Sequence, residues 1–365
     1  MKFLEEYRDR ERVEQLLHEI SRIVTKPWKI MEVCGGQTHG LVKNGIIGML
    51  PEKITMVHGP GCPVCVTPAS LIDEAIALSK KENVVLASFG DMIRVPGTSE
   101  SLLQAKAAGA DVRIVYSPLD ALRIAQAERE KQVVFFGVGF ETTAPAIALS
   151  VIQAKQLGLK NFFVLASHVL VPPAMEAILS DPANEINAFL AAGHVCTIMG
   201  EKEYYPIAAK YHVPIIITGF EPVDLLQGIL MAVKQLEAGE AKVENQYSRM
   251  VMPEGNPSAQ QLMQQVFATC DREWRGIGEI PSSGLEVNAG YSSFDARKKF
   301  SLPVISSTEK TECRAGEVLR GVLKPVQCEH FGKRCTPEHP LGAPMVSSEG
   351  ACAAYYHYHQ TAASE

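Results

Sequence analysis

The sequence predicts an α/β protein with two similar lobes, each a parallel sheet flanked by helices, and a third region that is irregular or helical. Three observations predict this fold. β-Branched segments alternate with helical segments from residue 30 to residue 218, Gly139-Phe-Glu-Thr returns as Gly219-Phe-Glu-Pro, and Pro and Gly turn formers interrupt the pattern after about Glu240. We therefore expect lobes at residues 28–126 and 127–240, with residues 1–27 and 241–365 forming the third region.

The individual elements follow from their periodicity. Val13, Leu16, Leu17, Ile20 and Ile23 recur at helical spacing and predict a leading amphipathic helix. The further expected elements are strands at residues 30–33, 54–57, 84–88, 112–116, 132–136, 162–166, 195–199 and 214–218, with helices such as 69–81 and 144–157 between them. Strands joined by crossover helices form parallel sheets, which bind ligands outside the carboxyl ends of their strands.

Composition excludes several classes of function. The 365 residues carry a net charge of -6, which offers no basic face for nucleic acid. No apolar run approaches the ~18 residues of a membrane helix, and the amino terminus has no apolar signal core. We therefore expect a cytoplasmic protein, in which nine cysteines, an odd number, serve as ligands, redox thiols and core residues rather than as a disulfide framework.

Three cysteines are predicted to lie together at one end of the first lobe. Cys62 and Cys65 follow the strand at residues 54–57 in a loop rich in Gly and Pro, and Cys34 directly follows the strand at residues 30–33. Two thiols at this spacing can close a disulfide, bind a soft metal, or share one ion with a third ligand. The nearby His39 and His58 are candidates for moving protons or fixing orientation.

Four further cysteines occur in the turn-rich tail, and they predict an inorganic centre. Cys313, Cys328, Cys335 and Cys352 are separated by 14, 6 and 16 residues. Four thiols suit either a 4Fe-4S cluster or a tetrahedral zinc ion. Structural zinc usually uses short Cys-x2-4-Cys pairs, which are missing here, so the spacing favours the cluster. Cys196 and Cys270 are interpreted as core residues.

Four features in this order carry a resemblance to a known family. They are Cys34-Gly-Gly-Gln-Thr-His-Gly, Gly59-Pro-Gly-Cys-Pro-Val-Cys, Gly137-Val-Gly-Phe-Glu-Thr-Thr-Ala-Pro145 and the late cysteine quartet. With them the chain closely resembles, over essentially its whole length, the HypD family of nickel-iron hydrogenase maturation factors. The resemblance implies that an iron atom acquires two cyanides and one carbon monoxide on a complex with the small chaperone HypC. It also implies that HypE and HypF supply the cyanide, and that the Fe(CN)2CO group passes to the hydrogenase large subunit.

The resemblance also assigns roles to the cysteines. It implies that Cys34, Cys62 and Cys65 are the working thiols and that the four late cysteines hold a 4Fe-4S cluster. Our hypothesis is that Cys34 and a chaperone cysteine hold the iron, while Cys62 and Cys65 cycle between dithiol and disulfide or bind iron transiently. Electrons for the disulfide would come from the cluster. Whether this assembly counts as catalysis or as scaffolding is left open.

Two other classes of function fit the same residues. One is a cytosolic thiol-disulfide oxidoreductase that uses its cluster to reduce the Cys62 and Cys65 pair for an unrelated partner. The other is a zinc-stabilised interaction scaffold without chemistry of its own. The colour and infrared spectra of the purified protein distinguish these alternatives.

Overall fold

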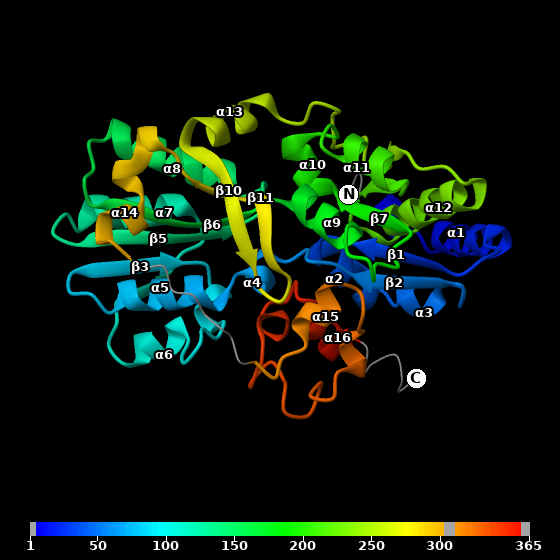
Figure 1. The fold of residues 1–365 in the computed structure, drawn as a ribbon, viewed down its shortest axis with the longest axis horizontal. Helices are drawn as coiled ribbons and strands as arrows, with labels where there is room; N and C mark the ends of the chain where they lie inside the picture. Colours follow the sequence, from blue (N-terminus) through cyan, green and yellow to red (C-terminus); the bar gives the residue numbers. More distant parts are fainter. Residues whose placement is uncertain (1–4, 303–310, 359–365) are drawn as a thin grey trace.

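Two α/β lobes lie side by side in the computed structural model, and a smaller C-terminal region packs beneath their junction (Figure 1). The structure describes residues 5–302 and 311–358. The parts of the expected third region that fall at residues 1–4, 303–310 and 359–365 lie outside these ranges. Within the described ranges, no helix is long and apolar enough to cross a membrane.

The first lobe is built on a five-stranded parallel sheet, sheet A, with the strand order β2-β1-β7-β8-β9. Its strands are β1 (Trp28–Glu32), β2 (Ile54–His58), β7 (Ala188–Ala192), β8 (Ile215–Thr218) and β9 (Val243–Asn245). Sheet A has a hydrophobic core on each face. One core includes helices α1 (Arg10–Ile23), α2 (Gly35–Lys43), α3 (Ile46–Met49) and α12 (Pro222–Ala238). The other includes α9 (Val171–Leu179), α10 (Gly193–Met199) and α11 (Tyr204–Tyr211). Burial on both faces explains the continuous apolar runs of the central strands.

The second lobe is built on a six-stranded mixed sheet, sheet B, with the order β10-β11-β6-β5-β3-β4. Its strands are β3 (Val84–Ser88), β4 (Val112–Ile114), β5 (Gln132–Gly139), β6 (Phe162–Val169), β10 (Phe267–Trp274) and β11 (Gly278–Val287). Four of these strands are parallel, and the antiparallel β10–β11 hairpin extends the sheet along β6. The helices in its two cores are α5 (Ala69–Ser79), α6 (Leu102–Ala107) and α14 (Ala296–Phe300) in one, and α7 (Pro118–Ala127), α8 (Ala144–Gln156) and α13 (Pro257–Val266) in the other.

The chain passes from one lobe to the other more than once. The range 28–126 gives β1 and β2 to sheet A but β3 and β4 to sheet B, and the range 127–240 is likewise shared. Residues after 240 add β9 to sheet A and the hairpin to sheet B. The predicted class, two α/β lobes with helix-flanked parallel strands, is confirmed, whereas each sheet is assembled from segments far apart in the sequence.

One predicted strand is wrong. Residues 195–199 lie within helix α10, and the strand of this part of the chain is β7, which ends at Ala192. A side chain at Gly193 would lie 2.3 Å from the backbone oxygen of Thr218, so the helix begins where the chain passes very close to β8. Short apolar runs do not distinguish a strand from a buried helix. The other seven predicted strands are present, and 84–88 has the same limits.

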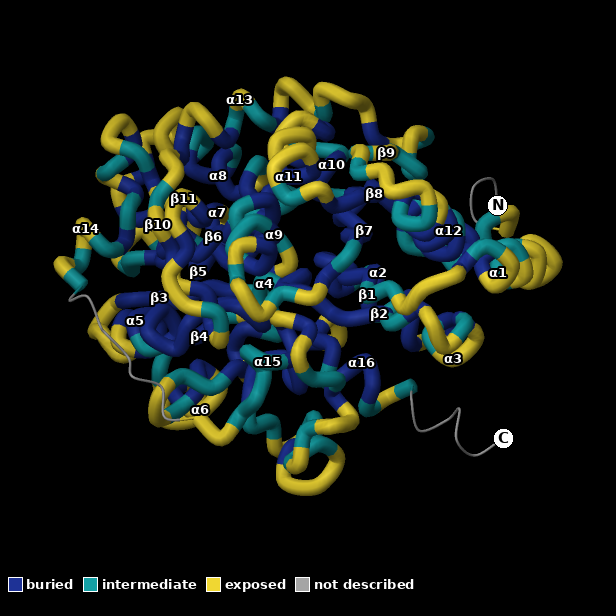
Figure 2. The backbone as a smooth tube through the Cα atoms, turned by 45° about the vertical axis from the view of Figure 1, so that its right-hand side comes forward, coloured by how far each residue is buried: buried dark blue, intermediate teal, exposed yellow. Residues whose placement is uncertain are grey.

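The C-terminal region contains little regular structure. Its described α-helices are α15 (Ala315–Leu319) and α16 (Ala351–Tyr358), and they are connected by loops and by the short 3-10 turns at Pro325–Gln327 and Ala343–Met345. Helix α16 packs against α2, while the turn at Ala343–Met345 packs against α4 (Pro63–Val66). The region therefore contacts both loops that carry the predicted working thiols. Figure 2 shows buried backbone at this junction and exposed backbone at the outer helices such as α1.

Candidate functional site

The loops of Cys34 and Cys62 are in direct contact. β1 and β2 are parallel neighbours, so both loops leave the same edge of sheet A, as predicted. The Gly35 N–H donates to the carbonyl oxygen of Gly61 at 2.8 Å. A side chain at Gly61 would lie 2.2 Å from the Cys34 nitrogen. The close approach of the two backbones therefore requires glycine at position 61.

Cys62 and Cys65 form a disulfide in the structure. Cys62 precedes the short helix α4, and its Sγ accepts a hydrogen bond from the Cys65 N–H at 3.2 Å. Both residues are buried. The sequence left open whether this pair closes a disulfide or binds a metal, and in the structure the pair is a disulfide.

The Cys34 sulfur lies at the amino end of α2, close to a histidine of helix α10. Cys34 occupies the cap position of α2, and its Sγ is 3.5 Å from Nδ1 of His194. Burial strongly raises the pKa of the Cys34 thiol, opposed by backbone N–H groups of Gln37 and Gly36 and reinforced by the Glu32 carboxylate. Burial also lowers the pKa of His194, to about 4. A neutral thiol beside a neutral imidazole is therefore the resting pair.

A buried carboxylate supports the same loop. Glu32 is fully buried, and its Oε2 accepts the Cys34 N–H at 2.9 Å. Its Oε1 accepts the Thr38 hydroxyl and lies 2.7 Å from Nδ1 of His58. Nε2 of His58 lies in turn 3.0 Å from the hydroxyl of Tyr355 on α16. Sequence reasoning singled out His58 but missed Glu32, although a charged residue in an apolar strand directly before Cys34 was a usable signal.

His39 lies on a different side of helix α2. Its ring packs edge to face against Tyr358, with 5.1 Å between the ring centres. Burial, followed by the nearby Lys43, lowers the pKa of His39, while a hydrogen bond with the Ser348 backbone opposes this. The histidine next to the Cys34 sulfur is thus His194 rather than His39. A role for His39 in proton movement stays a prediction.

The four late cysteines line one cavity in the C-terminal region. This cavity is bordered by Cys313, Cys328, Cys335 and Cys352 and by side chains such as Val318, Phe331 and Met345. The Leu341 N–H donates to the Cys335 sulfur at 3.4 Å. Burial raises the pKa of the Cys313 thiol to about 11 and that of Cys352 far above its usual range, and thiolates of the other cysteines reinforce the shift. Gathering four thiols in this way is unfavourable for their ionised form unless a cation offsets the charge.

The donor set of this cavity, four cysteine thiols, is the set that a 4Fe-4S cluster takes. In the described part of the chain, no three His, Cys, Asp or Glu residues are arranged to hold one metal ion. A 4Fe-4S cluster takes one thiolate at each iron, so its ligands surround a cube rather than meeting at a point. Four thiols around an apolar cavity, with a backbone N–H directed at one sulfur, match that requirement.

A second cavity adjoins the cysteine quartet and the loop after the disulfide. It measures about 390 Å³ and is bordered by Pro68, Arg275, Gly276, Cys313 and Gly342, among others. The Arg275 N–H, in the turn of the β10–β11 hairpin, donates to the Val66 carbonyl oxygen at 2.7 Å. The hairpin turn therefore touches both the disulfide helix α4 and the wall of the cysteine cavity.

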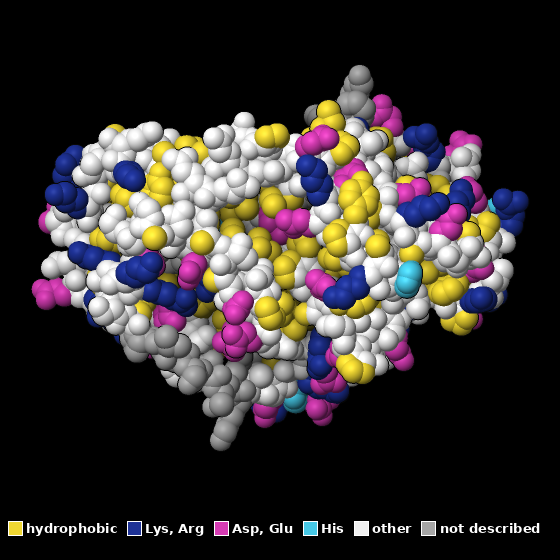
Figure 3. Space-filling model, turned by 45° about the horizontal axis from the view of Figure 1, so that its top comes forward, with side chains coloured by type: hydrophobic (Ala, Val, Ile, Leu, Met, Phe, Trp, Pro, Cys, Tyr) yellow, Lys and Arg dark blue, Asp and Glu magenta, His cyan; other side chains and the backbone are white. Residues whose placement is uncertain are grey.

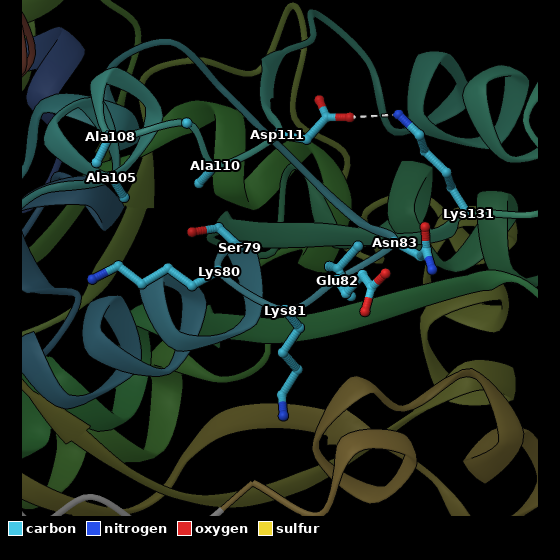
Figure 4. A pocket seen from close by; sticks show the side chains of 12 residues that line it. Ser79, Lys80, Lys81, Glu82, Asn83, Ala105, Ala108, Ala110, Asp111 and Lys131 are labelled. Atoms are coloured by element: carbon cyan, nitrogen blue, oxygen red, sulfur yellow. Dashed lines mark hydrogen bonds and ion pairs between the residues drawn. The ribbon is translucent and has the colours of Figure 1, made fainter.

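Another cavity lies away from these cysteines, and neither cysteine nor histidine lines it. It measures about 460 Å³ and is found where α5 leads into β3, with Asp111 and Lys131 at its border (Figure 4). Lys131 is paired with Asp111 at 2.8 Å, so these charges are used within the protein. On the face shown in Figure 3, the middle between the lobes is hollowed and lined mainly by hydrophobic side chains with a few acidic ones.

This combination of fold and site defines a class of protein: an α/β scaffold that gathers thiols at sheet ends and in a separate cysteine-lined cavity, suited to soft metals and to thiol redox chemistry. Comparison with known proteins gives the particular family. A family model described as "HypD: Hydrogenase formation hypA family" matches residues 11–359, and the chain belongs to the HypD family.

The relatives match over nearly their whole length. The chain is 48% identical to "Hydrogenase maturation factor HypD" of Escherichia coli (strain K12) over 368 residues, covering 99% of both chains. It is 46% identical to the protein of the same name from Rhodobacter capsulatus over 377 residues, covering 100% of both. It is 45% identical to "Hydrogenase expression/formation protein HupD" of Azotobacter chroococcum mcd 1, covering 98% of this chain and 97% of that one. The family is therefore one of hydrogenase maturation factors.

Proposed function

We propose that this protein, in complex with the chaperone HypC, scaffolds and redox-assists assembly of the Fe(CN)2CO group of nickel-iron hydrogenases. The observation that carries the proposal is the contact between the Cys34 loop and the loop of the Cys62–Cys65 disulfide. One thiol available for a metal thus lies next to a redox pair. HypE, supplied by HypF, would deliver cyanide, and the hydrogenase large subunit would receive the product in the cytosol.

The iron is the cargo of this reaction, and Cys34 is its proposed ligand on this protein. Ferrous iron with π-acceptor ligands suits a soft thiolate. The thiol proton must leave as the Fe–S bond forms, and Nδ1 of His194, 3.5 Å away, is placed to accept it. The N–H groups of Gly36 and Gln37 stabilise the resulting sulfur anion.

The disulfide gives the site a second chemical capacity. Its reduction consumes two electrons and two protons and yields two thiols, which can then contact iron transiently. Cys313, Cys328, Cys335 and Cys352 would hold a 4Fe-4S cluster, which would supply electrons one at a time. The turn at Ala343–Met345 borders this cavity and packs against α4, and the hairpin turn contacts α4 as well.

The disulfide also favours a second candidate function. A thiol-disulfide oxidoreductase would use the same Cys62–Cys65 pair on an unrelated partner and would need no iron at Cys34. Anaerobic purification gives the first discrimination. A brown protein with acid-labile sulfide supports the cluster, whereas a colourless protein containing zinc would leave only an interaction scaffold.

Infrared spectroscopy of the anaerobic complex with HypC decides between the first two functions. We expect carbonyl and cyanide stretches in the complex and their loss in Cys34→Ala. Cys196→Ala is the matched control, because Cys196 is equally buried but packs in the core next to Tyr204. A complex that is active in hydrogenase maturation yet lacks these stretches would refute the proposed function.

A further inference from the structure

We propose that Glu32, His58 and Tyr355 form a positioning chain that holds the Cys34 loop in place and couples it to helix α16. These three hydrogen-bonded side chains join segments that are remote in sequence. His58 lies 26 residues after Glu32, and Tyr355 lies 297 residues after His58. Tyr355 is on the same helix as Cys352, one of the four cysteines of the C-terminal cavity.

The geometry gives each member of the chain a defined partner. Glu32 uses both carboxylate oxygens: Oε2 accepts the Cys34 N–H at 2.9 Å, and Oε1 lies 2.7 Å from Nδ1 of His58. His58 uses both ring nitrogens, because Nε2 lies 3.0 Å from the Tyr355 hydroxyl. The two rings also meet edge to face, with 5.2 Å between centres.

Burial makes these hydrogen bonds matter. Glu32 has an exposed fraction of 0%, and His58 and Tyr355 each have 2%. A buried polar group that loses its partner cannot be satisfied by water, so losing one contact of a chain disfavours the whole arrangement. The Cys34 N–H is the terminal donor of this chain, and the orientation of the Cys34 sulfur follows from the position of its backbone.

The chain runs beside a second contact between the same elements. A side chain at Gly35 would lie 2.6 Å from Cβ of Glu349, just before α16. Helix α16 therefore fits closely over the amino end of α2. A displacement of α16 would separate Tyr355 from His58 and free the Glu32 carboxylate to release the Cys34 loop.

This inference rests on the proposed function only where it concerns the cluster. If Cys352 is a cluster ligand, a cluster in the cavity holds α16 in place. Loss of the cluster would then change the position of the Cys34 loop. The chain from Glu32 to Tyr355 is a property of the fold whether or not a cluster binds.

The test compares Tyr355→Phe with Tyr356→Phe in the full-length protein. The first variant removes only the Tyr355 hydroxyl that contacts Nε2 of His58, and it keeps the aromatic ring. The second removes a hydroxyl one residue away, on a side chain that packs against Phe331. The readout is the alkylation rate of Cys34 by iodoacetamide, followed by mass spectrometry of its peptide, with Cys196 as an internal standard.

We expect alkylation of Cys34 to be about tenfold faster in Tyr355→Phe, with no change in Tyr356→Phe or at Cys196. Equal rates for Cys34 in wild type and Tyr355→Phe would overturn the proposal. Should Tyr355→Phe lose stability, amide hydrogen exchange replaces alkylation as the readout. The exchange rate of the peptide that contains the Cys34 N–H is then compared with the rates of peptides from sheet B, in wild type and in the variant.

A second arm tests the coupling to the cavity. After iron chelation, alkylation of Cys34 should accelerate in wild type but change less than about twofold in Tyr355→Phe, because the connection is already broken. Equal acceleration in both proteins would contradict coupling through Tyr355. Protein that carries no iron would refute the cluster, while the first arm would still decide the role of the chain.

Discussion

At the scale of single residues, two buried titratable groups near the carboxyl end of β5 are held in their neutral forms. Burial raises the pKa of Glu141 to about 8, and its Oε2 has no hydrogen-bond partner among the described residues, while Oε1 accepts the Val171 N–H at 2.9 Å. Burial, reinforced by Arg272, lowers the pKa of His168 to about 3. Both nitrogens of His168 also lack a partner in the described part of the chain. Stability should therefore depend on pH through both groups.

Glu141→Gln isolates one of these contributions. The Glu141 carboxyl binds its proton more tightly in the folded protein than in the unfolded chain, where the pKa of this carboxyl is near 4.5. Its stabilisation is therefore complete below about pH 4.5 and is lost as the pH rises toward 8. Between about pH 5 and pH 8, we expect the free energy of unfolding of wild type to fall relative to Glu141→Gln by on the order of 4 kcal/mol.

Urea unfolding of both proteins across this pH range measures the effect. His168 contributes equally to wild type and variant, so it cancels in the difference. Glu279→Gln, at an exposed glutamate on β11, is the control and should run parallel to wild type. Parallel curves for Glu141→Gln and wild type would show that Glu141 is ionised in the fold.

Gly61→Ala tests the contact between the two thiol loops. The added methyl would lie 2.2 Å from the Cys34 nitrogen and 2.4 Å from its Cα, and backbone atoms cannot yield as a flexible side chain can. We expect a loss of about 2–3 kcal/mol in the free energy of unfolding, measured by urea titration. Gly48→Ala, where nothing lies within 4 Å of the added methyl, should cost nothing. A neutral Gly61→Ala would mean that the loops can separate.

At the scale of elements, the sequence predicted most strands but not the ends that matter for the site. β5 and β6 each extend three residues beyond the predicted limits, to Gly139 and Val169, and they stay paired over this extension, where Gly139 lies opposite His168. Residues 195–199 were assigned to a strand because a buried helix next to a sheet is as apolar as a strand. Periodicity carries no information about which neighbour buries a segment.

Helix α12 depends on a buried ion pair at its amino end. Asp224 is fully buried and receives two hydrogen bonds from Arg249, at 2.8 and 2.7 Å. The guanidinium also stacks on Tyr7 and Tyr247, at 3.8 and 4.5 Å from their ring centres. Removing the cation leaves a buried carboxylate without its main partner.

Arg249→Ala should therefore lower the free energy of unfolding by about 3 kcal/mol, measured by urea titration at neutral pH. Arg123→Ala is the matched control, because Arg123 pairs with Asp120 at 2.8 Å while its side chain is 73% exposed. That change should cost less than about 1 kcal/mol. Similar losses in both variants would show that the pair at α12 is not desolvated as the structure indicates.

At the scale of the whole molecule, the sequence predicted two lobes, and it predicted that the loops of Cys34 and Cys62 meet. The neighbouring strands β1 and β2 are joined by a short crossover, so local rules sufficed for them. His194 and Tyr355 could not be placed in the same way. His194 lies 160 residues after Cys34 and reaches the site because it follows β7, which pairs with β1. Tyr355 reaches the site through α16, whose packing on α2 has no periodic signature.

If the C-terminal region binds the proposed cluster, its order should depend on that cluster more than the order of the lobes does. Among the described residues its α-helices α15 and α16 have five and eight residues, and its contact with α2 is formed by the small buried cluster of Val42, Ala354 and Tyr355. Such a region needs a further constraint, which four ligands to one cluster would supply. On iron chelation under anaerobic conditions, we expect amide hydrogen exchange of residues 311–358 to accelerate about tenfold or more while strands β1 and β5 stay protected.

Mass spectrometry of the exchanged peptides measures this, and a pair of cysteine variants controls it. Cys335→Ser removes one of the four thiols that line the cavity, and it should reproduce the effect of chelation without any chelator. Cys270→Ser, at a half-buried thiol on β10 that accepts a hydrogen bond from Arg272, lies outside the quartet and should leave residues 311–358 unchanged. If exchange in this region is the same with and without iron, packing against α2 and α4 alone must hold it, and the four thiols would have no structural need of a cluster.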